Sequence, residues 1–180
     1  ELRKSDRFRF CVAFANQSGV ASLIQTLADL RNRGVRGQVL LSQYLNFTDP
    51  VALRMLRKLD NLEVRVATKG AMHAKGYYFL NHHQNRYLIG SSNWTASALS
   101  ANTELNVIIA SEPKSPFSNE VESEFNSQYQ AAEPLTDSYI DRYSIEYEQL
   151  WKKRNDIGIL LEESVHAPAL RPNKMQAEAL

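Results

Sequence analysis

The chain has 180 residues, of which 43% are hydrophobic, and its 21 Lys and Arg nearly balance its 20 Asp and Glu. This length suits one sizeable domain with a core of its own. One cysteine, Cys11, excludes a disulfide scaffold and indicates a reducing compartment, so we expect a cytoplasmic protein. No window is long and apolar enough for a membrane span, and no signal peptide is visible. Because the chain begins with Glu1 rather than Met, we interpret it as a piece of a longer protein.

The charges are unevenly distributed along the chain. Residues 1–70 hold 12 Lys and Arg against 6 Asp and Glu, whereas residues 111–180 hold 7 against 13. A basic half suits a polyanionic partner such as nucleic acid. Ordinary solvated helix faces would give the same imbalance, so both interpretations stay open.

The first 67 residues alternate between strand-like and helix-like patterns. Compact apolar runs at 8–15, 39–42 and 62–67 predict buried strands. Between them, apolar residues at helical spacing predict helices over 20–30 and 50–59, the second beginning at an Asp-Pro cap. This order favours an α/β fold, a mostly parallel mixed β-sheet flanked by helices.

The middle of the chain predicts a hairpin and one more strand. Strands are predicted at 73–79 and 86–89, joined by a polar turn. Thr95 or Ser97 caps a short helix, and the apolar run 105–110 predicts another buried strand.

The last third of the chain predicts helices. Ser115-Pro116 caps the first of them, and a second begins at Asp137 and ends around 155–158. The predicted domain organisation is a main domain over 1–132, a helical extension over 133–166 and a linker over 167–180.

The polar residues that could carry chemistry gather between Met72 and Asn106. In a strand, His73 and Lys75 would point to the same side. A neutral imidazole is a nucleophile or a base, and an ammonium holds an anion. The turn Gly90-Ser91-Ser92-Asn93 offers hydroxyl, amide and backbone N–H groups for phosphate oxygens. Glu104 could accept the proton on the far nitrogen of the imidazole and fix its orientation.

At these residues the chain resembles the phospholipase D superfamily, whose signature is H-x-K, four residues and an Asp, a G-S-x-N turn and a downstream Glu. The matching elements are His73-Ala74-Lys75, Gly90-Ser91-Ser92-Asn93 and Glu104, whereas Leu80 stands at the Asp position. The resemblance implies that the catalytic residues are His73, Lys75, Asn93 and Glu104. It implies that the phosphate-binding residues are Lys75, Ser91, Ser92 and Asn93, with no metal and no cofactor.

Chemistry of this superfamily uses two H-x-K sites that face each other, and this chain has one. His82-His83 is not a second copy, because Gln84 and Asn85 stand where the Lys would be. The resemblance therefore implies a twofold symmetric homodimer in which two copies of His73 meet. The implied activity is metal-independent phosphodiester hydrolysis through a phospho-histidine intermediate.

The substrate is open within the superfamily, which includes lipid hydrolases, lipid transferases and nucleases. The basic first half and the lack of an amphipathic membrane-binding stretch favour nucleic acid, DNA in particular, over a membrane. Residues 171–180 resemble the segment that opens the motor core of superfamily 2 helicases and restriction translocases, so we expect a C-terminal helicase motor in the longer protein. Two alternatives remain: a non-catalytic dimerising nucleic-acid-binding module, which Leu80 leaves open, and a phospholipase.

Overall fold

The computed structural model describes residues 1–163, with side chains described through residue 154. Residues 1–147 form one compact unit, and a second unit begins at residue 148. The strands of the first unit are β1 (Arg7–Val12), β2 (Arg36–Ser42), β3 (Leu62–Ala67), β4 (Lys75–Leu80), β5 (Asn85–Gly90), β6 (Asn106–Ser111) and β7 (Glu133–Pro134). The helices are α1 (Gln17–Asn32), α2 (Pro50–Arg57), α3 (Ala96–Ser100), α4 (Pro116–Ala131) and α5 (Asp137–Glu163), with short 3₁₀ turns η1 (Leu2–Lys4) and η2 (Tyr44–Asn46).

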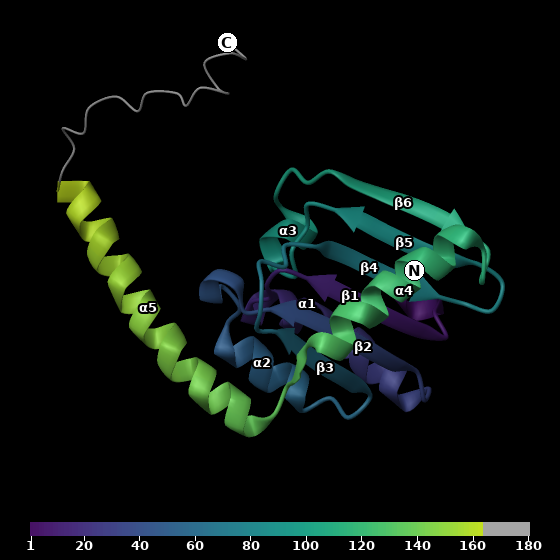
Figure 1. Cartoon of the computed structure of the whole chain (residues 1–180), viewed down its shortest axis with the longest axis horizontal. Helices are drawn as coiled ribbons and strands as arrows, with labels where there is room; N and C mark the ends of the chain where they lie inside the picture. Colours follow the sequence, from purple (N-terminus) through teal and green to yellow (C-terminus); the bar gives the residue numbers. More distant parts are fainter. Residues whose placement is uncertain (164–180) are drawn as a thin grey trace, which may run out of the picture. The chain divides into compact units, whose positions relative to one another are not determined.

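The strands form one seven-stranded mixed sheet in the order β6-β5-β4-β1-β2-β3-β7 (Figure 1). Pairing is parallel within β1–β3 and antiparallel for β4, β5, β6 and β7. The prediction of an α/β fold with helices flanking a mixed sheet is confirmed. The parallel part is restricted to the three strands joined by helical crossovers, because a hairpin such as β4–β5 pairs its strands antiparallel.

Helices cover both faces of the sheet. On one face, α1 and α2 pack apolar residues such as Leu27, Leu30 and Leu53 against the strand residues of the main core. On the other face, Phe125 and Tyr129 of α4 close a smaller core, and Figure 1 shows α4 crossing in front of the strands. These two layers hold the strand ends in fixed positions, and the polar residues of interest lie at those ends.

Helix caps follow the sequence signals closely. The side chains of Asn16, Asp49, Thr95 and Ser115 each accept a hydrogen bond from a backbone N–H of the first turn of α1, α2, α3 and α4. A proline follows the cap in α2 and α4, where its missing N–H has no partner to lose. The predicted helix starts at Asp49, Thr95 and Ser115 are therefore confirmed.

The two ends of the strands define two edges of the sheet. We call the carboxyl edge the side where β1–β3 and β5 end and β4 begins, since Val12 pairs with Lys75. We call the amino edge the opposite side, where Arg7 of β1 lies between Arg36 of β2 and Leu80 of β4. The chemistry predicted from the sequence falls at the carboxyl edge.

Strand β6 was predicted to be buried, and this prediction is wrong. It pairs with β5 alone at the end of the sheet, and Val107 and Ile108 are more than half exposed. An apolar run indicates a strand but carries no information on whether a neighbour covers it. The result is an exposed apolar strand next to the predicted site.

Helix α5 differs from the prediction in length and in its place in the domain. Tyr139, Ile140 and Tyr143 are buried in the main core, so the first unit extends through residue 147 and not only through the predicted 132. The helix also continues past Gly158, where an end was expected. A glycine costs only about 1 kcal/mol in a helix, which alone does not end one.

The predicted linker and motor entrance at 167–180 lie outside the described residues. Within the described part of the chain, no helix is both long and apolar enough to cross a membrane.

Candidate active site

His73 lies in the segment that leads into β4, and Lys75 is the first residue of that strand. The strand was expected to begin at His73 and begins two residues later. The ammonium of Lys75 nevertheless lies 2.9 Å from Nδ1 and 3.1 Å from Nε2 of the imidazole, and donates to the His73 carbonyl at 2.9 Å. His73 is exposed. The two side chains thus present one accessible cationic and nucleophilic centre.

Partial burial strengthens the attraction between the Lys75 ammonium and a bound anion. Desolvation lowers the pKa of Lys75 below its ordinary value, and the carboxylate of Glu104 opposes that shift. A charge that has lost part of its water gains more from a bound phosphate than a fully hydrated one.

Ser91 and Glu104 join the ends of β5 and β6. The Ser91 hydroxyl donates to Glu104 Oε2, and Asn102 Nδ2 donates to Glu104 Oε1 at 3.4 Å. The backbone N–H of Leu105 donates to Ser91 Oγ at 3.0 Å, and the N–H of Ser91 donates to the Leu105 carbonyl at 3.1 Å. These contacts fix Ser91 and Glu104 beside each other at the carboxyl edge. The predicted contact of Glu104 with the His73 ring stays a prediction.

Asn93 is oriented by the end of β1. Its Oδ1 accepts a hydrogen bond from the backbone N–H of Phe14 at 3.3 Å. This contact uses the acceptor end of the side chain and leaves the NH₂ group, the end that can bind a phosphate oxygen. The next residue, Trp94, is fully buried and donates from Nε1 to the Gly19 carbonyl at 2.9 Å, which anchors the turn to α1.

Ser92 was expected to bind phosphate, and this stays a prediction for its backbone N–H, because its side chain points inward. The residue is only 3% exposed, and its hydroxyl accepts a hydrogen bond from Asn106 Nδ2 at 2.8 Å. Its carbonyl accepts a hydrogen bond from the buried hydroxyl of Tyr77 at 3.1 Å. Alternation along the turn directs Ser91 outward and Ser92 inward, so Ser92 supports the turn.

Two supporting residues, Tyr77 and Asn106, were missed by the sequence analysis. Tyr77 follows Lys75 at strand spacing, which gives no sign of the hydrogen bond that its hydroxyl makes, and Asn106 carries no local signal. Gly90 has a separate role: a Cβ there would overlap the Leu105 carbonyl and the side chain of Asn106. The turn therefore needs glycine because β6 runs directly against it.

Leu80, at the position of the expected Asp, lies far from this cluster. It ends β4 at the amino edge, five residues beyond Lys75, which is ~17 Å at ~3.3 Å per residue. Its side chain is buried. An Asp side chain at this position would not reach His73 or Lys75.

His82 and His83 lie in the β4–β5 turn and are exposed, as predicted for hairpin-tip residues. Within the described residues, no group of three or more His, Cys, Asp and Glu side chains converges in a way that could hold a metal ion.

Comparison with protein families gives a match that spans most of the chain. The family described as cardiolipin synthase, PLD-like domain, matches residues 2–129. A search of curated proteins found no match.

Solved structures share the fold. The phospholipase D family member Nuc from Salmonella typhimurium superposes with a TM-score of 0.59 at 16% identity, covering 74% of this chain and 84% of that one. Phosphatidylserine synthase from Haemophilus influenzae Rd KW20 gives 0.60 at 18% identity, covering 88% of this chain and 41% of that one. The chain thus spans less than half of the synthase.

A polyphosphate kinase from Porphyromonas gingivalis is more distant, with a TM-score of 0.51, 15% identity, and coverage of 69% of this chain and 21% of that one. At these identities the structural likeness concerns the fold. The family match is evidence for family membership, because it covers most of the chain. The matched residues include His73, Lys75, the Gly90–Asn93 turn and Glu104. The chain belongs to the phospholipase D-like domain family.

Proposed function

We propose that this chain is a metal-independent phosphodiesterase that hydrolyses nucleic acid, DNA in particular, as a homodimer. The observation that carries the proposal is the exposed His73 with the Lys75 ammonium against both ring nitrogens. Ser91, Asn93 and Glu104 lie at the same carboxyl edge and supply hydrogen-bonding groups beside it. This set provides a nucleophile and preorganised donors for phosphate oxygens.

The first half-reaction uses the two copies of His73 in different protonation states. The neutral imidazole of one copy attacks phosphorus, so that a P–N bond forms while the P–O bond to the leaving group breaks. The imidazolium of the second copy gives its proton to the leaving oxygen. In the second half-reaction, water attacks phosphorus, the P–N bond breaks, and the second imidazole takes the proton of the water. The two rings titrate as a coupled pair.

Lys75, Ser91 and the Asn93 amide bind the non-bridging oxygens in this scheme. Their charge and dipoles stabilise the negative charge that grows as phosphorus becomes five-coordinate. Removing one such preorganised donor typically lowers the rate by ~10²- to 10³-fold. Glu104 keeps Ser91 in place and orients the imidazole.

The homodimer follows from the presence of one H-x-K motif in the chain. A C₂ axis repeats the same surface on both subunits, so an exposed His73 near the axis would meet its own copy. Leu105, 81% exposed and adjacent to Glu104, gives the rim of the site an apolar surface that a second copy could cover. A helicase or restriction-type motor following this domain is part of the same proposal.

The choice of nucleic acid as the substrate is supported by the excess of Lys and Arg over Asp and Glu in residues 1–70. A lipid phosphodiester is the second candidate, because η2 exposes Tyr44, Leu45 and Phe47. Phe47 packs on Phe14 with ring centroids 5.7 Å apart, and the N–H of Phe14 holds Asn93. The exposed apolar residues of η2 therefore lie close to the proposed phosphate site. The sequence had given no sign of such exposed aromatics.

The test incubates the purified chain with supercoiled plasmid in EDTA. We expect nicking by the wild type, loss of nicking in His73→Ala, and full nicking in the matched control His83→Ala, which removes an exposed imidazole outside the site. Binding of DNA without cleavage by the wild type would instead identify a non-catalytic binding module. Headgroup release from phospholipid vesicles without nicking would identify the lipid enzyme.

A further inference from the structure

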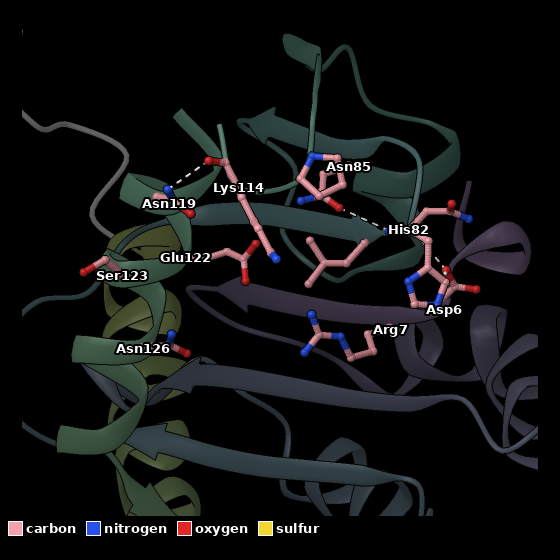
Figure 2. A pocket seen from close by; sticks show the side chains of 12 residues that line it. Asp6, Arg7, His82, Asn85, Lys114, Asn119, Glu122, Ser123 and Asn126 are labelled. Atoms are coloured by element: carbon pink, nitrogen blue, oxygen red, sulfur yellow. Dashed lines mark hydrogen bonds and ion pairs between the residues drawn. The ribbon is translucent and has the colours of Figure 1, made fainter. Parts of the chain in front are cut away.

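Two neighbouring cavities lie along the amino edge, the opposite side of the sheet from the proposed active site. The first, about 700 Å³, lies between the start of β1, the β4–β5 turn and the first half of α4 (Figure 2). The second, about 510 Å³, lies at the starts of β1, β2 and β3. Arg7 lines both cavities, and we call the two together the amino-edge depression.

Arg7 and Arg36 place two like charges side by side in this depression. They are direct partners in the parallel pairing of β1 and β2, and both are exposed. Within the described residues neither has an ion pair with a carboxylate. Like charges directly opposite each other on neighbouring strands destabilise a sheet. Phosphates of one polyanion, each bound beside one of the two guanidinium groups, would turn this repulsion into attraction.

Lys114 adds a third cation from the segment before α4. Its backbone adopts a left-handed conformation with φ 66°, and its carbonyl accepts a hydrogen bond from Asn119 Nδ2 at 3.0 Å. Figure 2 shows its side chain reaching into the first cavity from the side opposite Arg7. It too has no ion pair with a carboxylate in the described part of the chain.

The carboxylates around the depression already have partners. Glu122 pairs with Arg9 at 3.4 Å, and Glu63 pairs with Arg65 at 3.7 Å. The remaining two carboxylates also contact other groups: Asp6 accepts from the His82 backbone N–H at 3.0 Å and lies 3.6 Å from its ring, and Asp60 lies 3.9 Å from Arg31. Because His82 carries a charge only when it is protonated, Asp6 stays a negative charge beside Arg7, and the three cations Arg7, Arg36 and Lys114 outnumber it.

We propose that this depression binds the phosphates of a nucleic-acid strand as a second site, separate from the His73 centre. The assignment to nucleic acid rests on the proposed function. Two neighbouring cavities with cations in both suit a linear polyanion better than a single phosphate, because each cation meets a different charge. Amide side chains such as Asn119 and Asn126 line the depression and can bond to sugars and base edges.

The separation from the active site sets the expected behaviour. Arg7 pairs with Leu80 at one end of β4 and Val12 pairs with Lys75 at the other, so the two sites lie ~17 Å apart along the strand. A small phosphodiester bound at the His73 centre does not reach the second site, whereas a long strand can occupy both sites at once. The second site therefore affects binding of long substrates and leaves hydrolysis of small ones unchanged.

The test uses the triple variant Arg7→Gln, Arg36→Gln, Lys114→Gln, with Lys58→Gln as a control that removes an exposed charge at the end of α2. Fluorescence anisotropy of a labelled 30-nucleotide strand is measured across a salt series in EDTA, with hydrolysis of bis(p-nitrophenyl) phosphate measured in parallel. We expect weaker binding by the triple variant and a log K against log salt slope smaller by about 2, at ~0.7 per lost phosphate contact. Hydrolysis of the small substrate and the melting temperature should not fall.

Equal salt slopes for the triple variant and the control would overturn the proposal. If inorganic polyphosphate of the same charge binds the wild type as tightly as the oligonucleotide and loses affinity in the same variant, the assignment to nucleic acid is overturned as well. If the wild type does not hydrolyse the small substrate but the binding difference remains, the proposed activity fails while the second site stands.

Discussion

The hydroxyl of Tyr77 is the best place to test whether the Gly90–Asn93 turn belongs to an active site. It is buried and donates to the Ser92 carbonyl at 3.1 Å. Tyr77→Phe removes one hydrogen bond, about 1 kcal/mol of stability, and leaves a buried carbonyl without its donor. For a protein of this size that lowers the melting temperature by about 2–4 °C.

The same substitution should have a larger effect on catalysis. The turn carries Ser91 and Asn93, and losing its support lets both donors move. A displacement of ~1 Å can cost up to ~10²-fold, so we expect kcat/KM on a phosphodiester to fall by about 10- to 100-fold. The assay is steady-state hydrolysis in EDTA at a temperature where the variant is fully folded.

Tyr129→Phe provides the matched control. Its buried hydroxyl donates to the Glu63 carbonyl at 2.8 Å, away from the turn. The melting temperature of Tyr129→Phe should fall by a similar number of degrees, while its kcat/KM stays unchanged. If both variants lose stability equally and keep full activity, the turn does not position catalytic donors and the site assignment is refuted.

Lys75→Met abolishes hydrolysis yet raises the melting temperature at pH 7, because burial lowers the pKa of Lys75 and so disfavours its charged form in the folded protein. The difference in melting temperature between variant and wild type should shrink as the pH rises toward 10.5, where the wild-type ammonium also deprotonates in the unfolded chain. A gap that widens with pH would contradict this. Burial raises the pKa of Cys11 to about 12, so the native thiol should not react with a disulfide reagent at pH 8, and Cys11→Ala should keep activity. Gly90→Ala forces β6 away from the turn at a cost of about 1–3 kcal/mol; an unchanged melting temperature and rate would show that the backbone there is not constrained.

Local signals explain what the sequence predicted correctly. Caps at Asp49, Thr95 and Ser115 act within one helical turn, so the residues that decide each helix start are neighbours in the chain. The β4–β5 hairpin is also local, since a short polar turn joins two apolar runs. The same holds for His73 and Lys75, whose spacing of two residues keeps them together even though the strand begins later than expected.

Features that depend on contacts between distant segments were not predictable. The exposure of β6 follows from its place at the end of the sheet order, which no apolar run reveals. The burial of Ser92 depends on Asn106, which reaches it from the next strand. The pairing of Arg7 with Arg36 follows from the register of two strands separated by a whole helix. Such contacts are set by topology, and a single sequence carries no direct record of them.

The most direct measurement is the number of phosphates bound to His73 during turnover. The purified chain is mixed with a ³²P-labelled phosphodiester in EDTA, quenched in alkali, where a phospho-histidine survives, and the labelled peptide is identified by mass spectrometry. We expect the label on His73, with one labelled His73 for every two chains, and no label in His73→Ala. A label on another residue, one label on every chain, or a label that persists in His73→Ala would contradict it.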